Sequence, residues 1–327
     1  MAARATRSAS RRTRVAEAVA TGPLGALSHD ELGVIVDGLA DPLQPVVAVA
    51  LSSTCLGLRT PLRAALEVLK VRHARAVALC RKLNSGYMDL TRGFNPSDRD
   101  GISCAVLRDA WRLSCGRPRK EVRKGSRSLN SVDMATLGMI LPWMPKLEEL
   151  YLYLVGIDDA GMQALCEGLV RGSLPALYYV NLSNNEIGAS GAEALAAALC
   201  KLPGLSLLDL FGNPFGDQGM AALATPLRKL PHLEGLKISQ TDISDDGLDL
   251  LLANLSKDDF KELEELHLFN DDITGKGYAA LASALVDGAM PKLSSLPTAT
   301  SGRPDARMAM ADKADALEAR GVYLHLL

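Results

Sequence analysis

Histidine and cysteine are the residues with which this chain could bind a metal or attack a substrate. Its five histidines are isolated, and none has a cysteine or a second histidine at the spacing of a zinc site. The six cysteines form no close pair in the sequence: Cys55, Cys80, Cys104, Cys115, Cys166 and Cys200. A Gly-rich phosphate loop and a Gly-x-Ser-x-Gly segment are also missing. We therefore expect no enzyme activity, no cofactor and no metal.

Paired carboxylates could act as a general acid and base, and two such pairs are Asp158 with Asp159 and Asp245 with Asp246. Each pair directly precedes a segment with helical apolar spacing. Acids at that place are stabilised by the partial positive charge of a helix N-terminus. We interpret both pairs as helix caps.

The segment LYYVNLSNNEIGASGAEALAAAL, residues 177–199, shows which elements hold these side chains. Leu177, Val180 and Leu182 have the spacing of a short strand with one buried face. After Gly191 the apolar residues recur at helical spacing, among them Leu195. A strand and a helix in so few residues cannot bury their own apolar faces, so the unit must stack on copies of itself.

Four further copies of this unit are present. The first leucine recurs at intervals of 30, 28, 28 and 30 residues: Leu147, Leu177, Leu205, Leu233 and Leu263. A glycine stands before each helix: Gly161, Gly191, Gly219, Gly247 and Gly277. The frame Leu-x-x-Leu-x-Leu-x-x-Asn-x-Ile resembles the ribonuclease-inhibitor-like class of leucine-rich repeats. This resemblance implies an α/β horseshoe, a solenoid with a parallel inner sheet and outer helices. We assign the repeats to residues 129–296 and a C-terminal cap with one helix to 297–327.

The asparagine of the frame normally bonds the backbone of its turn. It is present at Asn185 and Asn213, whereas Val155, Thr241 and Asp271 replace it elsewhere. We therefore expect the first and fourth turns to be less well tied.

The N-terminal part differs in charge from the repeats. Residues 1–128 hold 22 Lys and Arg against 11 Asp and Glu, a net charge of +11, and the remainder holds 14 against 27, a net charge of −13. Residues 1–22 are Arg-rich and acid-poor, as in an organelle transit peptide, a disordered basic tail or a nuclear-import patch. Residues 84–128 are expected to form a linker and N-terminal cap. Their basic run at 117–127 lacks the aromatic platforms of nucleic-acid sites, so we do not expect nucleic acid as a partner.

Residues 23–83 are predicted to be helical, with one long amphipathic helix over 59–83. Their order of apolar, acidic and proline residues resembles an F-box, which docks the adaptor subunit of cullin-type ubiquitin ligases. The adaptor-binding positions implied by this resemblance are Leu27, Leu32, Ile35, Leu39 and Leu58. The chain departs from the motif at Ser28, where proline is common, and at Leu58, where tryptophan is frequent. The alternative is a plain helical cap on the solenoid.

The concave side of the predicted sheet is the candidate binding surface. Side chains that alternate with the buried leucines must face this open side. Five of fifteen such positions are aromatic: Tyr151, Tyr153, Tyr179, Phe211 and Phe269. Charged or polar neighbours accompany them: Glu149, Asp209, Lys237, Glu265 and His267. Aromatic residues favour strands for packing reasons alone, which is one explanation. The other is that they anchor a protein partner, because large aromatic side chains supply much of the energy of interfaces.

The sequence thus predicts a protein-binding receptor or scaffold. It is either a substrate receptor of a cullin-type ubiquitin ligase or a stand-alone interaction module, and a third hypothesis is a GTPase-activating protein with similar repeats. The chain has no run of about eighteen apolar residues, so we expect no membrane span. The lack of paired cysteines favours a reducing compartment, cytoplasmic or nuclear, and the Arg-rich N-terminus leaves organelle targeting open.

Overall fold

The computed structural model describes residues 40–46, 48–50, 63–84, 104–110, 112–115, 129–169, 174–256, 258–269, 272–298 and 304–326. The chain forms two compact units, residues 1–80 with 103–107, and residues 81–102 with 108–327. The five F-box-like positions, Leu27, Leu32, Ile35, Leu39 and Leu58, lie outside the described residues.

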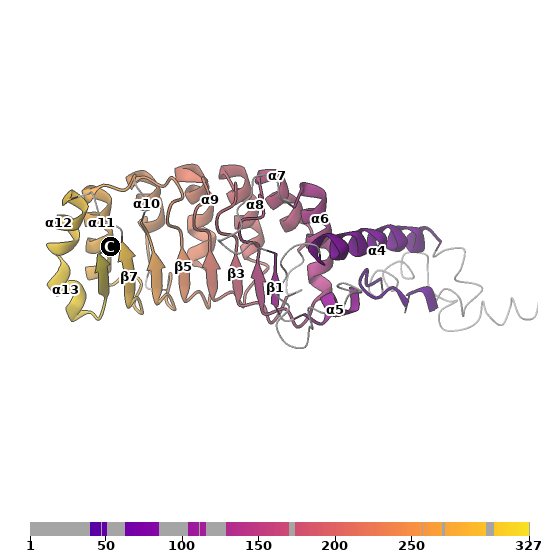
Figure 1. Ribbon diagram of the computed structural model, residues 1–327. Coiled ribbons are helices and arrows are strands. Elements are labelled where there is room, and N and C mark those ends of the chain that lie inside the picture. The colour runs from indigo at the N-terminus through magenta and orange to yellow at the C-terminus, as the bar shows by residue number, and fades with distance from the viewer. Residues whose placement is uncertain are drawn as a thin grey trace, which may run out of the picture. The chain divides into compact units, whose positions relative to one another are not determined.

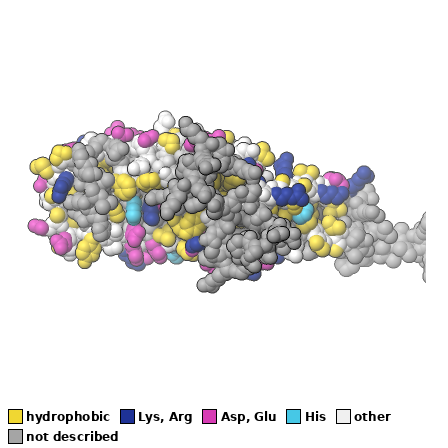
Figure 2. All heavy atoms as spheres, viewed as in Figure 1, with side chains coloured by type: hydrophobic (Ala, Val, Ile, Leu, Met, Phe, Trp, Pro, Cys, Tyr) yellow, Lys and Arg dark blue, Asp and Glu magenta, His cyan; other side chains and the backbone are white. Residues whose placement is uncertain are grey.

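The described part of the first unit contains helices and, at residues 40–45, an irregular segment with bends and a turn. Helix α4 (Arg63–Asn84) begins in this unit and matches the long helix predicted over 59–83, and α5 (Cys104–Arg108) is short. Leu69 is buried with Ala40 and Ala48. Figure 2 shows Lys and Arg side chains, in dark blue, over α4, in keeping with the basic N-terminal half of the sequence.

The second unit contains an eight-stranded parallel sheet whose strand order follows the sequence (Figure 1). Its strands are β1 (Arg112–Ser114), β2 (Glu149–Tyr151), β3 (Tyr179–Asn181), β4 (Leu207–Asp209), β5 (Gly235–Lys237), β6 (Glu265–His267), β7 (Ser295–Thr298) and β8 (Tyr323–Leu326). Consecutive strands pair in parallel throughout. The sheet is open and helices separate its successive strands, which confirms the predicted α/β solenoid.

Helices alternate with the strands and lie together on one side of the sheet (Figure 1). They are α6 (Ser131–Ile140), the 3-10 helix η1 (Leu141–Trp143), α7 (Asp159–Glu167), α8 (Ala189–Leu199), α9 (Gly216–Arg228), α10 (Asp245–Leu252), α11 (Gly275–Val286), α12 (Pro304–Ala311) and α13 (Ala314–Ala319). The middle residue of each repeat strand is buried beneath them, as at Leu150, Leu208 and Leu236. This burial of the leucine frame forms the continuous core that stacked repeats require.

The sheet extends past the predicted repeat range, 129–296, at both ends. Strand β1 lies within 84–128, the segment expected to be a linker and cap, and it pairs with β2 along its whole length. At the other end, two helices replace the single one expected near 305–319, and β8 follows them. The C-terminal segment therefore adds a strand to the sheet as well as helices to the end of the solenoid.

Asn185 ties the turn of the preceding repeat rather than only its own. Its Oδ1 accepts hydrogen bonds from the amides of Val155 and Ile157, both at 3.1 Å, and its Nδ2 donates to the Leu152 and Leu182 carbonyls, both at 2.7 Å. The first turn, where valine replaces the asparagine, is thus held by its neighbour. Our expectation of a loosely tied first turn is wrong, because the bond crosses between repeats.

The fourth turn is also tied, although by a different side chain. Thr241 is completely buried, and its Oγ1 donates to the carbonyl of Ile238 at 2.8 Å. A threonine hydroxyl makes fewer such bonds than an asparagine amide, so this turn receives less from its own side chain than the turn at Asn213 does.

Three of the four paired carboxylates, Asp158, Asp159 and Asp245, cap helices, but not always their own. Asp158 accepts from the amide of Gly161 in its own helix at 2.8 Å. Asp159 instead reaches the next repeat, where its Oδ1 accepts from the amides of Gly188 and Gly191 at 2.7 and 2.9 Å. A Cβ at Gly191 would lie 2.7 Å from this oxygen, which explains the glycine; it lies in the first turn of α8 rather than before the helix.

The same capping recurs further along the solenoid. Asp245 Oδ1 accepts from the amides of Thr274 and Gly277 at 2.8 and 3.1 Å, and the Thr274 hydroxyl donates to Asp245 Oδ2 at 2.6 Å. Asp217 binds Ser244 in the same way. Its Oδ1 accepts from the Ser244 amide at 2.8 Å, and its Oδ2 accepts from the Ser244 hydroxyl at 2.6 Å. Three helices therefore start on a carboxylate that belongs to the repeat before them.

Candidate functional site

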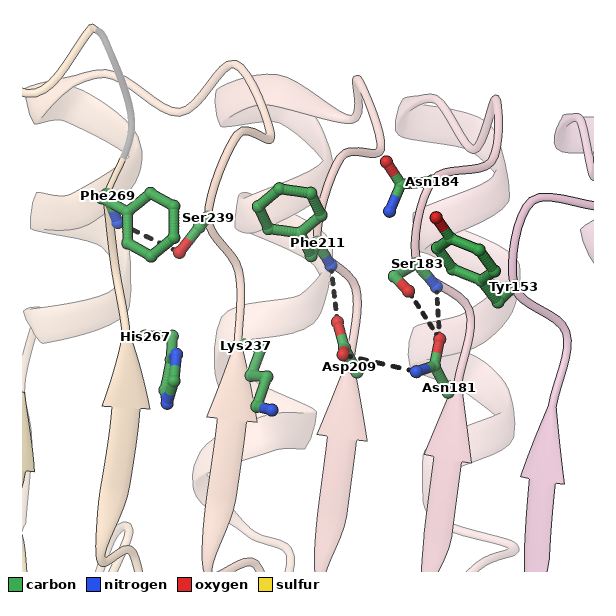
Figure 3. A pocket seen from close by; sticks show the side chains of 10 residues that line it. All are labelled: Tyr153, Asn181, Ser183, Asn184, Asp209, Phe211, Lys237, Ser239, His267 and Phe269. Carbon is green, nitrogen blue, oxygen red and sulfur yellow. Dashed lines mark hydrogen bonds between the residues drawn. The ribbon is translucent and has the colours of Figure 1, made fainter. Parts of the chain in front are cut away.

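The open face, which we define as the side of the sheet away from the helices, carries the predicted binding residues in register. Glu149, Tyr179, Leu207, Gly235 and Glu265 pair from strand to strand, and so do Tyr151, Asn181, Asp209, Lys237 and His267. Tyr153, Ser183, Phe211, Ser239 and Phe269 follow just beyond the strands. Figure 3 shows members of these rows standing on the side of the sheet opposite the helices. The predicted alternation of side chains is thereby confirmed.

The aromatic side chains on this face pack against one another. The rings of Tyr151 and Tyr179 meet edge to face, with centroids 4.9 Å apart and planes at 78°. Phe211 and Phe269 lie in alternate repeats, yet their ring centroids are only 6.1 Å apart at 60°. Fully buried Ser239 stands between them, and its small side chain leaves the space over which the two rings approach. The rings remain partly accessible to solvent.

A hollow of about 250 Å³ opens on this face between the rings and the strand side chains. It is lined by Tyr153, Asn181, Ser183, Asn184, Asp209, Phe211, Lys237, Ser239, His267 and Phe269 (Figure 3). The aromatic side chains form one end, and the polar side chains of β3 to β6 form the other. A ligand group seated here would meet an apolar wall and hydrogen-bonding groups together.

A hydrogen-bond network fixes the polar side chains of the hollow. Asn181 Nδ2 donates to the Tyr179 hydroxyl at 3.2 Å and to Asp209 Oδ2 at 3.4 Å, and Asn181 Oδ1 accepts from the Ser183 amide and hydroxyl at 3.0 and 2.6 Å. Asp209 Oδ1 accepts from the amide of Phe211 at 3.1 Å. These side chains are held in place before any ligand arrives, which lowers the entropy lost on binding.

The charged and titratable side chains of the hollow differ in how their neighbours shift their pKa and in whether they have a partner. Burial raises the pKa of Asp209, although the Phe211 amide and the charges of Lys237 and His267 act against it. Burial and the Lys237 charge lower the pKa of His267, although Glu265 and Asp209 act against them. The Lys237 ammonium makes no hydrogen bond or ion pair with any other residue that the structure describes. It is thus a cation available to a ligand.

Glu149 does not fit the expected partner-binding role, because its carboxylate binds other residues of this chain. It is 6% exposed, it pairs with Arg112, and it accepts from the Tyr178 hydroxyl at 2.6 Å. Burial alone would raise the pKa of Glu149, but these hydrogen bonds outweigh burial and hold it below its ordinary value. The Arg112 guanidinium also lies 5.0 Å from the centre of the Tyr151 ring. We therefore remove Glu149 from the candidate contact residues.

Sequence reasoning missed Arg112 because it falls in the segment expected to be a linker. The available signal was Leu113, which occupies the position of Leu150 in the neighbouring strand. Of the remaining predicted residues, Tyr153, Asp209, Phe211, Lys237, His267 and Phe269 line one hollow. Tyr151, Tyr179 and Glu265 lie in the same rows outside its lining.

Comparison with known families agrees with this geometry. The family model described as Leucine Rich repeat matches residues 177–196, 205–224 and 229–252. Each matched segment supplies one strand of the parallel sheet and the start or whole of the following helix. This part of the chain is a leucine-rich-repeat solenoid. Two of these ranges start on Leu177 and Leu205, the first leucines of their repeats, and the third starts at Lys229, before Leu233.

The leucine-rich-repeat solenoid is also similar to a solved structure described as a crystal structure of a TLR13-ssRNA13 complex. The identity is 20%, the match covers 60% of this chain and 30% of that chain, and the TM-score is 0.31. This chain thus spans less than a third of that protein's length. Curated proteins yielded no match.

Two further features of the described residues bear on the chemistry of the site. Within the ranges given above, no group of three or more His, Cys, Asp or Glu side chains could hold a metal ion. None of the helices in those ranges is long and apolar enough to cross a membrane.

Proposed function

We propose that the solenoid is a protein-binding scaffold whose contact surface is the open face around the hollow. The observation that carries this proposal is the row of Tyr153, Phe211 and Phe269, half-buried rings separated by buried serines on a rigid sheet. Aromatic residues on preorganised surfaces dominate the energy of interfaces, because they bury a large area and lose little freedom. Packing within the sheet alone would not leave an accessible hollow beside them.

The chemistry of the hollow suggests how a partner is oriented. An apolar partner side chain fits against Phe211 and Phe269, while the Lys237 ammonium offers a charge-assisted hydrogen bond to a carboxylate or carbonyl. Glu265, the first residue of β6, is exposed and lies outside the lining of the hollow, so we assign it to the rim of this surface, where charges affect association rate more than affinity.

The test uses the full chain with Phe211→Ala and Phe269→Ala combined. Leu250→Ala and Val286→Ala combined is the matched control, because both residues are 40% exposed on the helices. A partner is captured with the wild-type protein and its Kd is then measured by calorimetry for all three forms. Loss of a ring at the centre of an interface weakens binding by about 2 kcal/mol or more, roughly 30-fold in Kd. Equal affinity for all three forms would show that the partner uses another surface.

A finer proposal is that the chain is a substrate receptor of a cullin-type ubiquitin ligase, with repeats of the ribonuclease-inhibitor-like class. The order of Leu27, Leu32, Ile35, Leu39 and Leu58 supports the first part, and the repeat length of 28 to 30 residues supports the second. Replacement of Ile35 and Leu39 by Asp in the full chain is expected to remove adaptor and cullin subunits from the captured material while the partner of the open face is retained. Their absence with the wild-type chain as well favours a stand-alone interaction module.

A further inference from the structure

Two buried thiols of the first unit lie close together although they are 24 positions apart in the sequence. The Sγ atoms of Cys80 in α4 and Cys104 in α5 are 3.8 Å apart. The residues are 2% and 8% exposed, so Cys104 retains limited access to small solutes. A disulfide requires the two sulfurs to approach to about 2.05 Å, a closure of less than about 2 Å from this arrangement.

The environments of the two thiols are unlike each other. The two thiols share a hydrogen bond that lowers the pKa of Cys104; the nearby charge of His73 acts in the same direction, whereas burial and the charge of Asp41 act against it. The same bond raises the pKa of Cys80. His73 is held in this unit by its Nδ1, which donates to the Pro42 carbonyl at 2.7 Å.

The buried thiols of the solenoid provide a contrast. Burial raises the pKa of Cys115 and of Cys166 to about 12, so both remain protonated and unreactive at neutral pH. Neither has another cysteine sulfur within hydrogen-bonding distance among the described residues. Among the described residues, a thiol with a lowered pKa that is in contact with a second thiol is found at Cys104, beside Cys80.

We propose that Cys80 and Cys104 form a peroxide-reactive dithiol that is reversibly oxidised to a disulfide joining α4 to α5. The Cys104 thiolate attacks one oxygen of a peroxide and the O–O bond breaks. With hydrogen peroxide the leaving hydroxide takes up a proton as water, and Cys104 becomes a sulfenic acid. Oxidation removes the Cys104 thiolate whose hydrogen bond and charge raise the pKa of Cys80. The Cys80 sulfur then attacks Cys104 Sγ, the S–S bond forms, the S–O bond breaks, and hydroxide leaves with the Cys80 proton as a second water. The peroxide gains the two electrons that the thiols lose.

The structural consequence is a covalent connection between α4 and the short α5. In the reduced state the buried sulfurs of the two helices are in contact but not covalently joined. A cross-link between two segments so far apart in sequence restricts the opened chain much more than the packed one. Oxidation is therefore expected to slow amide exchange in α4, and a dithiol reductant is expected to restore it.

The experiment treats the full-length protein with hydrogen peroxide, removes the excess with catalase, alkylates free thiols in denaturant, and maps unreduced peptides by mass spectrometry. The expected product joins the peptides of Cys80 and Cys104, is lighter by two hydrogen atoms, and disappears with dithiothreitol. Exposed Cys200 serves as the internal measure of nonspecific oxidation. Protein unfolded in urea before treatment is expected to lose the preference for this pair.

Two conservative variants separate the roles of the thiols. Cys80→Ser is expected to leave Cys104 as a sulfenic acid that dimedone traps, whereas Cys104→Ser is expected to leave Cys80 as a free thiol. Circular dichroism establishes that each variant is folded. The inference is overturned if the peroxide treatment oxidises Cys200 of the wild-type protein while Cys80 and Cys104 both remain fully available to the alkylating reagent. It is also overturned if Cys104 links to other cysteines as often as to Cys80.

Discussion

Replacement of Asn185 by alanine is expected to destabilise the turn of the repeat before it. The side chain is 6% exposed and makes four hydrogen bonds of 3.1 Å or shorter, to the amides of Val155 and Ile157 and the carbonyls of Leu152 and Leu182. A hydrogen bond contributes about 1 kcal/mol net, and a buried group left without a partner forfeits at least that much. We expect Asn185→Ala to lower the free energy of unfolding by about 4 kcal/mol.

The assay is urea unfolding followed by far-UV circular dichroism, together with amide exchange read by mass spectrometry. Glu186→Ala is the matched control, because Glu186 is the exposed neighbour. The amides of Val155 and Ile157, thirty and twenty-eight positions earlier, are expected to exchange faster in the variant. A loss below about 1 kcal/mol, or faster exchange only around residue 185, would refute the inter-repeat bond as a main support of that turn.

Two further predictions concern the solenoid. Gly247→Ala would place a Cβ against Asp217 Oδ1 and 2.7 Å from Ile243 Cγ2, so we expect urea unfolding to show a free energy of unfolding lower by about 1 to 3 kcal/mol. Adding Asp217→Ala should reduce the loss caused by Gly247→Ala. Strictly additive effects of the two substitutions would contradict the clash. Burial alone would raise the pKa of Asp259, but hydrogen bonds from Lys229 and Ser256 hold it at about 2 against an ordinary 3.8. Because the pKa is lowered in the folded state, this stabilisation is complete above about pH 4 and disappears as the pH falls toward 2. Thermal melts of Asp259→Asn should lack that part of the acid dependence, and an unchanged pH profile would exclude it.

The periodic part of the fold could be predicted because each repeat has the same alternation of apolar and outward-facing residues. Leu150 and Leu208 are buried where a period of two requires it, and the side chains between them stand in register on the open face. The aromatic row at Tyr153, Phe211 and Phe269 follows from the same alternation. It needed no knowledge of long-range contacts.

Interactions between repeats could not be read from the frame. The sequence places Asn185 in its own turn, yet nothing in it states that the amide reaches Val155 in the turn before. The burial of Glu149 depends on Arg112, whose strand is three residues long and lacks the rest of the frame. The contact of Cys80 with Cys104 likewise depends on tertiary packing across 24 positions. Local periodicity carries no information about such partners.

The two kinds of bond between repeats run in opposite directions along the solenoid. Asp159, Asp217 and Asp245 reach forward to the next helix, whereas Asn185 reaches back to the previous turn. A cut at any strand-to-strand boundary in this region therefore separates a donor from its acceptor on one side or the other. At the boundaries that Asp159, Asp217 and Asp245 bridge, an inserted copy would keep these caps only if it brought a carboxylate for its successor and found one in its predecessor; α9 begins without a side-chain cap. The number of repeats should thus change less readily here than the residues of the open face, on which neither bond depends.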